Sequence, residues 1–161
     1  MNYKSKFSEY EYSGRTFFND VLTTSTKTTN ITFTEDKYNP VDVYWNTDFS
    51  FNVGEIKFRN GYSSTSPIIV NEGAMLEKTK YDALKEKQKL SGCTPYYIVE
   101  FNDGVGYIWN LSDMKNVEWK EEKDKYPRTT CGNTEKTTKA VTYLKLDDAK
   151  KFKFRMNLNP N

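Results

Sequence analysis

One stretch, VDVYWNTDFSFNVGEIKFRN from Val41 to Asn60, constrains the fold of this chain more than any other. Its apolar residues recur at every second position, which is the period of a half-buried β-strand, and a polar run at 46–48 supplies a turn. The stretch predicts a β-hairpin with arms at 41–46 and 49–58. Charged residues nevertheless interrupt the apolar pattern, although burying a charge costs free energy: Asp42, Glu55, Lys57 and Arg59.

Strict alternation places one set of side chains of the return arm on a common face: Phe49, Phe51, Val53, Glu55, Lys57 and Arg59. Gly54 allows a β-bulge that would re-aim the residues after it. In either case Glu55 and Lys57 point the same way and Ile56 points to the opposite face. We expect the apolar surface of the hairpin to come from Val43, Trp45, Phe49, Phe51, Ile56 and Phe58.

Around the hairpin, the sequence predicts a helix over 5–22 and an extended segment within the threonine-rich 23–34. A loop at 61–67 precedes a second helix over 74–90, which ends at Ser91-Gly92 and carries an apolar seam of Leu76, Ala83, Leu84 and Leu90. Strands follow at 94–101 and 105–111. After these we expect a short strand within 114–122, a long loop at 123–139 and a last strand at 140–146.

This order of elements predicts an α/β fold, with a mixed β-sheet flanked by helices in one domain over 1–161. The domain divides into a core over about 5–111 and a C-terminal extension of strand and loop over about 112–161. No apolar run is long enough to span a membrane and no signal peptide begins the chain, so we expect a soluble, cytoplasmic protein. Cys93 and Cys131 are too few for a disulfide framework and are expected to be buried or incidental thiols.

The chain contains no histidine. This excludes Ser-His-Asp and Cys-His catalysis, HNH-type nucleases, and histidine-ligated zinc or haem. Any chemistry must come from carboxylates, lysine, tyrosine, hydroxyls or a hard metal ion held by oxygen.

The run Pro40-Val41-Asp42, followed after residues 43–54 by Glu55-Ile56-Lys57, resembles the PD-(D/E)XK signature of the restriction-endonuclease-like nucleases. The resemblance covers 5–111 as architecture and three residues as motif, and it implies an αβββαβ core. Val41 separates the proline from Asp42, which departs from the usual signature. The resemblance extends to a phage-type or Holliday-junction-resolvase-like member of that superfamily.

The chemistry of the three residues stands without the family. Asp42 and Glu55, on paired strands, can bring carboxylate oxygens together, and with the backbone carbonyl of Ile56 they form an oxygen site suited to Mg²⁺ or Mn²⁺. Such a metal polarises a phosphate and lowers the pKa of bound water. Lys57 would orient that water or stabilise charge on the phosphate, because two neighbouring carboxylates oppose the lowered pKa that a lysine base needs. Arg59, on the same face, could hold a phosphate bidentately.

The family resemblance implies further, auxiliary residues. Helices of such nucleases often return a polar side chain to the metal site, and the candidates on the second helix are Glu77, Lys80, Tyr81 and Gln88. Glu9 or Glu11 could offer a carboxylate from the first helix. The alternative for these positions is an ordinary exposed helix face with Glu–Lys pairs.

These observations predict a Mg²⁺-dependent nuclease that hydrolyses DNA phosphodiester bonds at Asp42, Glu55 and Lys57. The C-terminal third is rich in lysine and arginine, and Arg128, Lys136 and Lys139 are its candidates for phosphate contact. A homodimer is left open. Three alternatives remain: a catalytically inactive nuclease-like fold that binds nucleic acid or protein, an α/β domain whose resemblance is accidental, and an Asp/Glu–Lys salt bridge on a solvent-facing hairpin.

Overall fold

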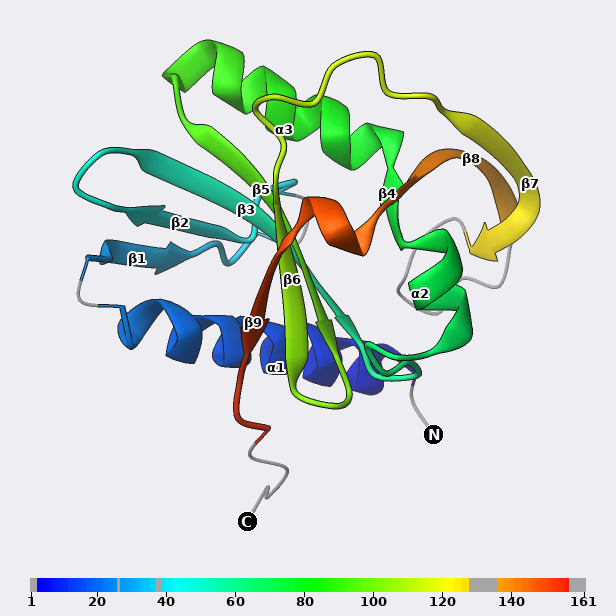
Figure 1. Ribbon diagram of the computed structural model, residues 1–161, viewed down its shortest axis with the longest axis horizontal. Helices are drawn as coiled ribbons and strands as arrows, with labels where there is room; N and C mark the ends of the chain where they lie inside the picture. Colours follow the sequence, from blue (N-terminus) through cyan, green and yellow to red (C-terminus); the bar gives the residue numbers. More distant parts are fainter. Residues whose placement is uncertain (1–2, 26, 37–38, 128–135, 157–161) are drawn as a thin grey trace.

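The computed structural model describes the backbone of residues 3–25, 27–36, 39–127 and 136–156, and the side chains of 9–25, 27–36, 39–123 and 137–156. Its main sheet has six strands in the order β1-β2-β3-β5-β6-β9, with α1 on one face and α3 on the other (Figure 1). These strands are β1 (Thr29–Phe33), β2 (Val43–Asn46), β3 (Phe51–Arg59), β5 (Thr94–Phe101), β6 (Val105–Asn110) and β9 (Lys150–Lys153). The predicted α/β fold with a mixed sheet flanked by helices is confirmed.

The first helix, α1 (Tyr3–Thr23), lies where the sequence predicts it and extends slightly beyond. It buries Phe17, Phe18 and Leu22 against the sheet, and each such side chain contributes roughly 1.5–3 kcal/mol of transfer free energy. Gly14 brings the helix close to β3, because a Cβ at this position would lie 3.2 Å from the Cβ of Phe58. Gly14 is therefore a contact point between helix and sheet.

The predicted hairpin is present as β2 and β3, which pair antiparallel with Val43 opposite Gly54. The pairing runs without a bulge, so the alternation of side chains continues through Gly54, and Val53 and Glu55 are both buried. The prediction for Phe49 and Phe51 is wrong, since their side chains are 94% and 40% exposed. Both residues lie near the turn of the hairpin. Val53, the next residue on this face of β3, packs in the hydrophobic core that also contains Leu84 of α3.

The second helix, α3 (Lys78–Ser91), connects β3 to β5, which are parallel neighbours with Glu55 opposite Tyr97. A crossover helix is the usual connection between parallel strands. Leu84 is fully buried in the core beneath α3, whereas Leu90, which the sequence placed in the same apolar seam, is 75% exposed. The helix ends at Gly92, whose left-handed backbone returns its N–H to the carbonyl of Gln88, as the sequence predicts.

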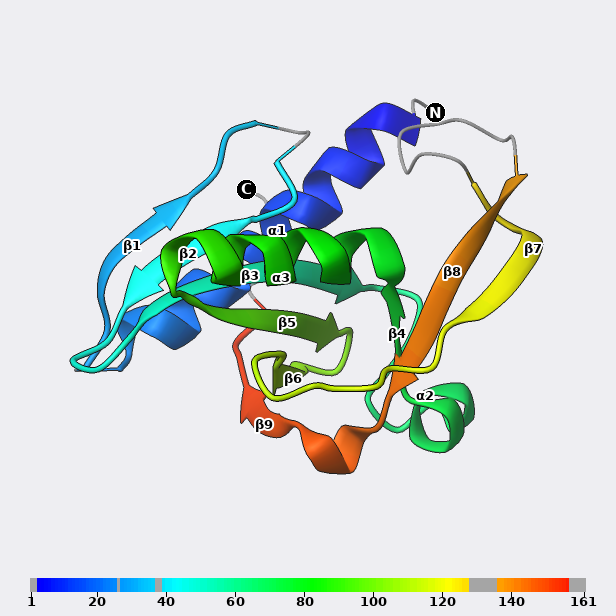
Figure 2. The same cartoon turned by 90° about the horizontal axis from the view of Figure 1, so that it is seen from above.

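The prediction that this helix begins at residue 74 is wrong, because residues 74–77 form a strand instead. This strand, β4 (Ala74–Glu77), belongs to a second sheet in the order β4-β8-β7, which stands beside the main sheet (Figure 2). The predicted loop over 123–139 is also wrong in part, since it contains most of β7 (Lys120–Pro127) and the start of β8 (Lys136–Leu144). The sequence did not predict the short helices α2 (Pro67–Glu72) and η1 (Leu146–Asp148), nor the edge strand β9.

The predicted αβββαβ order is present as α1-β1-β2-β3-α3-β5, with α2 and β4 inserted before α3. Cys93 is a buried free thiol, as expected, and Cys131 lies outside the described residues. Among the helices that the structure describes, none combines the length and apolarity needed to cross a membrane.

Glu100, on β5, presents an unusual buried acid on the α1 face of the sheet. Its side chain is fully buried, and neither carboxylate oxygen has a hydrogen-bond partner among the described residues. Burial raises the pKa of Glu100 well above its ordinary value of 4.5. The folded protein therefore keeps this proton at pH values where the unfolded chain has released it, and stability falls as the pH rises through that range.

Replacing Glu100 with Gln should remove this dependence and stabilise the protein at alkaline pH. The wild-type free energy of unfolding should fall with pH by up to about 1.4 kcal/mol per pH unit above the unfolded-state pKa, and the slope should be smaller in Glu100→Gln. Urea unfolding at several pH values between 5 and 9 measures both slopes. Glu86→Gln, on an exposed position of α3, is the control and should keep the wild-type slope. An unchanged slope in Glu100→Gln would show that Glu100 is not the titrating group.

Candidate functional site

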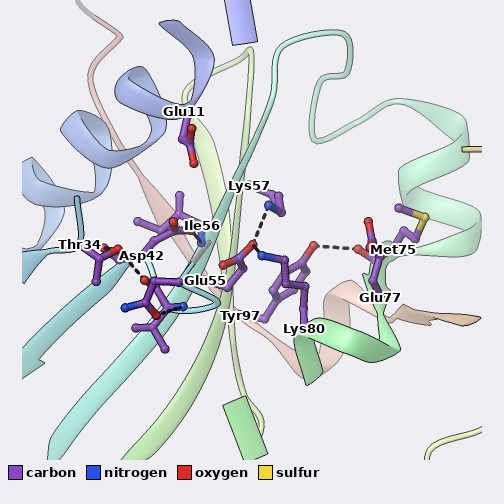
Figure 3. A network of polar contacts seen from close by, with 12 residues as sticks. Glu11, Thr34, Asp42, Glu55, Ile56, Lys57, Met75, Glu77, Lys80 and Tyr97 are labelled. Carbon is purple, nitrogen blue, oxygen red and sulfur yellow. Dashed lines mark hydrogen bonds and ion pairs between the residues drawn. The ribbon is translucent and has the colours of Figure 1, made fainter. Parts of the chain in front are cut away.

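The hairpin brings Asp42 and Glu55 together from two strands. Val43 lies opposite Gly54, so the next step along the antiparallel ladder places Asp42 beside Glu55. The backbone N–H of Asp42 donates to the carbonyl of Gly54 at 2.8 Å, which fixes this step. Figure 3 shows the resulting cluster, with Lys57 beside Glu55 on β3 and Lys80 reaching it from α3. The buried charges of the sequence thus converge on one place.

Both oxygens of Asp42 are held by donors. Oδ1 accepts from the Arg15 guanidinium at 2.8 Å, and Oδ2 accepts from the backbone N–H of Ile56 at 2.8 Å. The side chain is buried, and this burial, together with the nearby Glu55 carboxylate, raises the pKa of Asp42 from 3.8 to about 6. Lys57, the Ile56 N–H and Arg15 oppose the shift without cancelling it. Asp42 is therefore an acid whose charge is only partly compensated by its neighbours.

Arg15 is a residue of this site that the sequence did not predict. Besides Asp42, its guanidinium donates to the backbone carbonyl of Thr34, and it lies 3.9 Å from the carboxylate of Glu11 one turn earlier on α1. Arg15 thus connects α1 to Asp42, the residue directly before β2. The sequence offers only a weak signal for this role, a lone arginine among aromatic residues of the helix, because no local spacing connects Arg15 to Asp42.

Glu55 is more deeply buried than Asp42, with only 1% of its surface exposed. Its Oε1 lies 2.6 Å from the Lys57 ammonium and 3.0 Å from the Lys80 ammonium. Burial alone would raise the pKa of Glu55, but the two lysines lower it below the ordinary value. Its second oxygen, Oε2, has no hydrogen-bond partner among the described residues. Glu55 is therefore an ionised carboxylate with one oxygen still available to a ligand.

Lys57 keeps its proton in this environment. Burial would lower its pKa, but the negative charge of Glu55, with smaller effects of Tyr97 and Asp42, raises it above the ordinary value of 10.5. A lysine with a raised pKa cannot serve as a general base near neutral pH. It can orient a water molecule or stabilise a developing negative charge, which is the role that the sequence favours.

The auxiliary residues divide into those near the cluster and those away from it. Lys80 joins it directly, and Glu11 approaches it through Arg15. Tyr81 instead donates its hydroxyl to the carbonyl of Met114, and Gln88 accepts from Lys85 at 2.7 Å. Glu9 is exposed on α1.

Glu77 is the last residue of β4, not part of the helix, and pairs with Lys139 of β8 at 3.0 Å. The sequence predicts that Lys139 contacts phosphate, whereas in the structure its ammonium pairs with the Glu77 carboxylate. Arg59 follows Lys57 on the same face of β3, close enough to influence the pKa of Tyr97. Arg128 lies outside the described residues, as does the side chain of Lys136.

The donor set of the cluster fits a hard divalent cation. Two carboxylates and a backbone carbonyl are the oxygen ligands that Mg²⁺ and Mn²⁺ prefer, and the unpartnered Oε2 of Glu55 is a buried acceptor. The N–H of Ile56 points to Asp42, and within a strand the carbonyl of a residue points to the same side as its N–H. The described residues contain no group of three or more acidic, histidine or cysteine side chains that could hold a metal. A cation here would thus have few protein ligands and retain positions for water and substrate.

Comparisons with known proteins find a distant structural likeness and no match in sequence. No model of a known protein family matches the sequence, and no curated protein matches it. Among solved structures, the chain is similar to Hjc, a Holliday junction resolvase from the archaeal hyperthermophile Archaeoglobus fulgidus. The two share 11% sequence identity over 80% of this chain and 83% of that chain, with a TM-score of 0.47.

The proximity of the two acids predicts a coupled titration. In the metal-free protein the Asp42 carboxyl should titrate near pH 6, and the midpoint should fall in Glu55→Gln because the neighbouring negative charge is removed. Carboxyl ¹³C chemical shifts measured against pH report this directly, and the signal assigned to Asp42 should be absent in Asp42→Asn.

Glu77→Gln is the matched control, since Glu77 pairs with Lys139 and is not among the groups that shift Asp42. It should leave the Asp42 midpoint unchanged. An Asp42 midpoint near 4 in the wild type, or one insensitive to Glu55→Gln, would contradict the convergence of the two carboxylates.

Proposed function

We propose that this protein is a metal-dependent nuclease that hydrolyses DNA phosphodiester bonds. The observation that carries the proposal is the buried pair of Asp42 and Glu55, placed side by side by the hairpin, with a lysine two residues after the glutamate. Burying two acids together is unfavourable unless cations neutralise them. Burial and the neighbouring Glu55 raise the pKa of Asp42, so Arg15 and Lys57 do not fully compensate the charge of this acid. A divalent cation would supply the remaining positive charge.

In this proposal Asp42, Glu55 and the Ile56 carbonyl hold Mg²⁺ or Mn²⁺. The metal, when bound, polarises the scissile phosphate and lowers the pKa of its water. Lys57 stays protonated and stabilises negative charge on the phosphate. Arg15 and the Ile56 N–H hold the Asp42 carboxylate in place, so that its ligand position is fixed before substrate arrives.

The nucleic-acid partner is inferred from the charge around the acids. Lys57 and Lys80 lie at the cluster and Arg59 follows on the same face, so a phosphate group that approaches Glu55 meets three cations. Lysine and arginine near a metal site are the usual partners of phosphodiester oxygens. We propose DNA as the substrate.

A second candidate function is a nuclease-like fold that binds nucleic acid without cutting it. The observation in its favour is that Oε1 of Glu55 already contacts two ammonium groups and both oxygens of Asp42 have donors. A cluster compensated in this way could persist without a metal. The two functions are separated by cleavage, because both predict binding to DNA.

Purified protein should cut supercoiled or branched DNA in the presence of Mg²⁺ or Mn²⁺, and EDTA should abolish cutting. Asp42→Asn, Glu55→Gln and Lys57→Met should each lower the cleavage rate by roughly 10²–10³, as removal of a single stabilising group does in other enzymes. A gel assay of nicked and linear products measures the rate.

Lys89→Met, on an exposed position of α3, is the matched control and should cleave at the wild-type rate. Cleavage that persists in Glu55→Gln or Lys57→Met would remove these residues from the active site. DNA binding without cleavage of any substrate would favour the binding module.

A further inference from the structure

A group of aromatic side chains lies at the tip of the hairpin that forms the candidate site. It consists of Tyr44, Phe49 and Phe51, accompanied by Lys87 of α3, and is called the tip cluster below. Phe51 lies on the same face of β3 as Glu55, and Tyr44 lies on β2, two residues after Asp42, which directly precedes that strand. The cluster is therefore an extension of the site's own strands.

The rings of the tip cluster form an ordered surface. The rings of Tyr44 and Phe51 stack with centroids 5.9 Å apart and an interplanar angle of 10°. The Lys87 ammonium lies 5.6 Å from the centre of the Tyr44 ring. Phe51 is 40% exposed and Phe49 is 94% exposed, so a substantial part of the aromatic surface faces solvent. Exposing a phenylalanine forgoes burial free energy, and a contact with a ligand would recover it.

The position of the tip cluster relative to the site suits a strand of nucleic acid. Phe51 precedes Glu55 by four residues of β-strand, which is about 13 Å. Lys80, beside Glu55, and Lys87, beside Tyr44, are seven residues apart on α3, which is about 10.5 Å. Stacked nucleotides are spaced about 3.4 Å apart, so each separation corresponds to at most about four nucleotides, and to fewer where the bases are unstacked. Lys87 places a positive charge beside the tip cluster, and Lys80 places another beside Glu55.

We propose that the tip cluster binds unpaired nucleotides of single-stranded DNA, within about four nucleotides of the phosphate that the candidate site attacks. This inference deepens the proposed nuclease function by naming a substrate class, DNA with an unpaired segment next to the cleavage point. Bases stack on exposed aromatic rings regardless of sequence, and a neighbouring cation contacts the phosphates. A base in a duplex has both faces covered by its neighbours, so an open aromatic ring selects an unstacked base.

The lysines favour nucleic acid over a protein partner for this surface. An apolar contact between two proteins would need only the hydrophobic area of Phe49 and Phe51. The tip cluster instead pairs a flat aromatic stack with the Lys87 ammonium and continues toward Lys80 and Lys57. Charge complementarity along this line matches a phosphate backbone.

Fluorescence anisotropy of a labelled oligo-dT of about 15 nucleotides in EDTA tests the proposal without requiring cleavage. The wild type should bind it, and Phe51→Ala should weaken binding about tenfold, the loss typical of one base–aromatic stack. Phe51→Leu keeps the apolar character but removes the ring and should weaken binding similarly, whereas Phe51→Tyr should bind like the wild type. Lys87→Gln should weaken binding and reduce its salt dependence.

Tyr12→Ala is the control, because Tyr12 is 73% exposed on α1, on the opposite face of the sheet, and should not affect binding. A thermal melt of each variant establishes that it is folded. Absence of oligo-dT binding by the wild type, or binding as tight as that of the wild type by Phe51→Ala and Phe51→Leu, would overturn the proposal. A homodimer in light scattering that Phe51→Ala disrupts would also overturn it, by assigning the surface to self-association. Loss of binding in Phe51→Leu supports the proposal even if the protein cuts no DNA.

Discussion

Nearby cations compensate the charge of two acids that are buried side by side in this structure. Asp42 and Glu55 cannot both be ionised in the interior without nearby positive charge. The chain supplies that charge from three elements: Arg15 from α1, Lys57 from β3 and Lys80 from α3. These contacts join the first helix, the hairpin and the crossover helix at one point. The cluster therefore contacts both helix layers and the sheet, so the charges at the site depend on how these layers pack.

The buried acids on the two faces of the sheet differ in their charged partners and in the direction of their pKa shifts. On the α3 face, Glu55 has ammonium partners and a pKa below its ordinary value. On the α1 face, Glu100 has no partner among the described residues and a pKa far above it. The first arrangement keeps a carboxylate ionised and available to a cation, whereas the second keeps an acid neutral inside an apolar layer. Burial alone therefore does not mark a functional acid here, and the cations around Glu55 make the distinction.

The features that the sequence predicts correctly are those whose signal is local. The two-residue period predicts the hairpin and the common face of Glu55 and Lys57. The pair Ser91-Gly92 predicts the end of α3. The features that the sequence does not predict depend on partners that are distant along the chain. Arg15 meets Asp42 only because α1 packs across the start of β2, and residues 74–77 form a strand only because β8 pairs with them. Phe49 and Phe51 show the same limit, because alternation predicts a face but not how far a helix covers it.

We propose that Asp42 and Glu55 share a divalent cation. The most direct test is a crystal structure of the protein soaked in Mn²⁺, with anomalous data collected to locate the metal. We expect one anomalous peak between the two side chains, within about 2.0–2.3 Å of an oxygen of each and of the Ile56 carbonyl. Glu55 would then contact the metal through Oε2, the oxygen that has no partner among the described residues. A crystal with Lys57 and Lys80 still on Glu55 and no anomalous peak near Asp42 would contradict the claim.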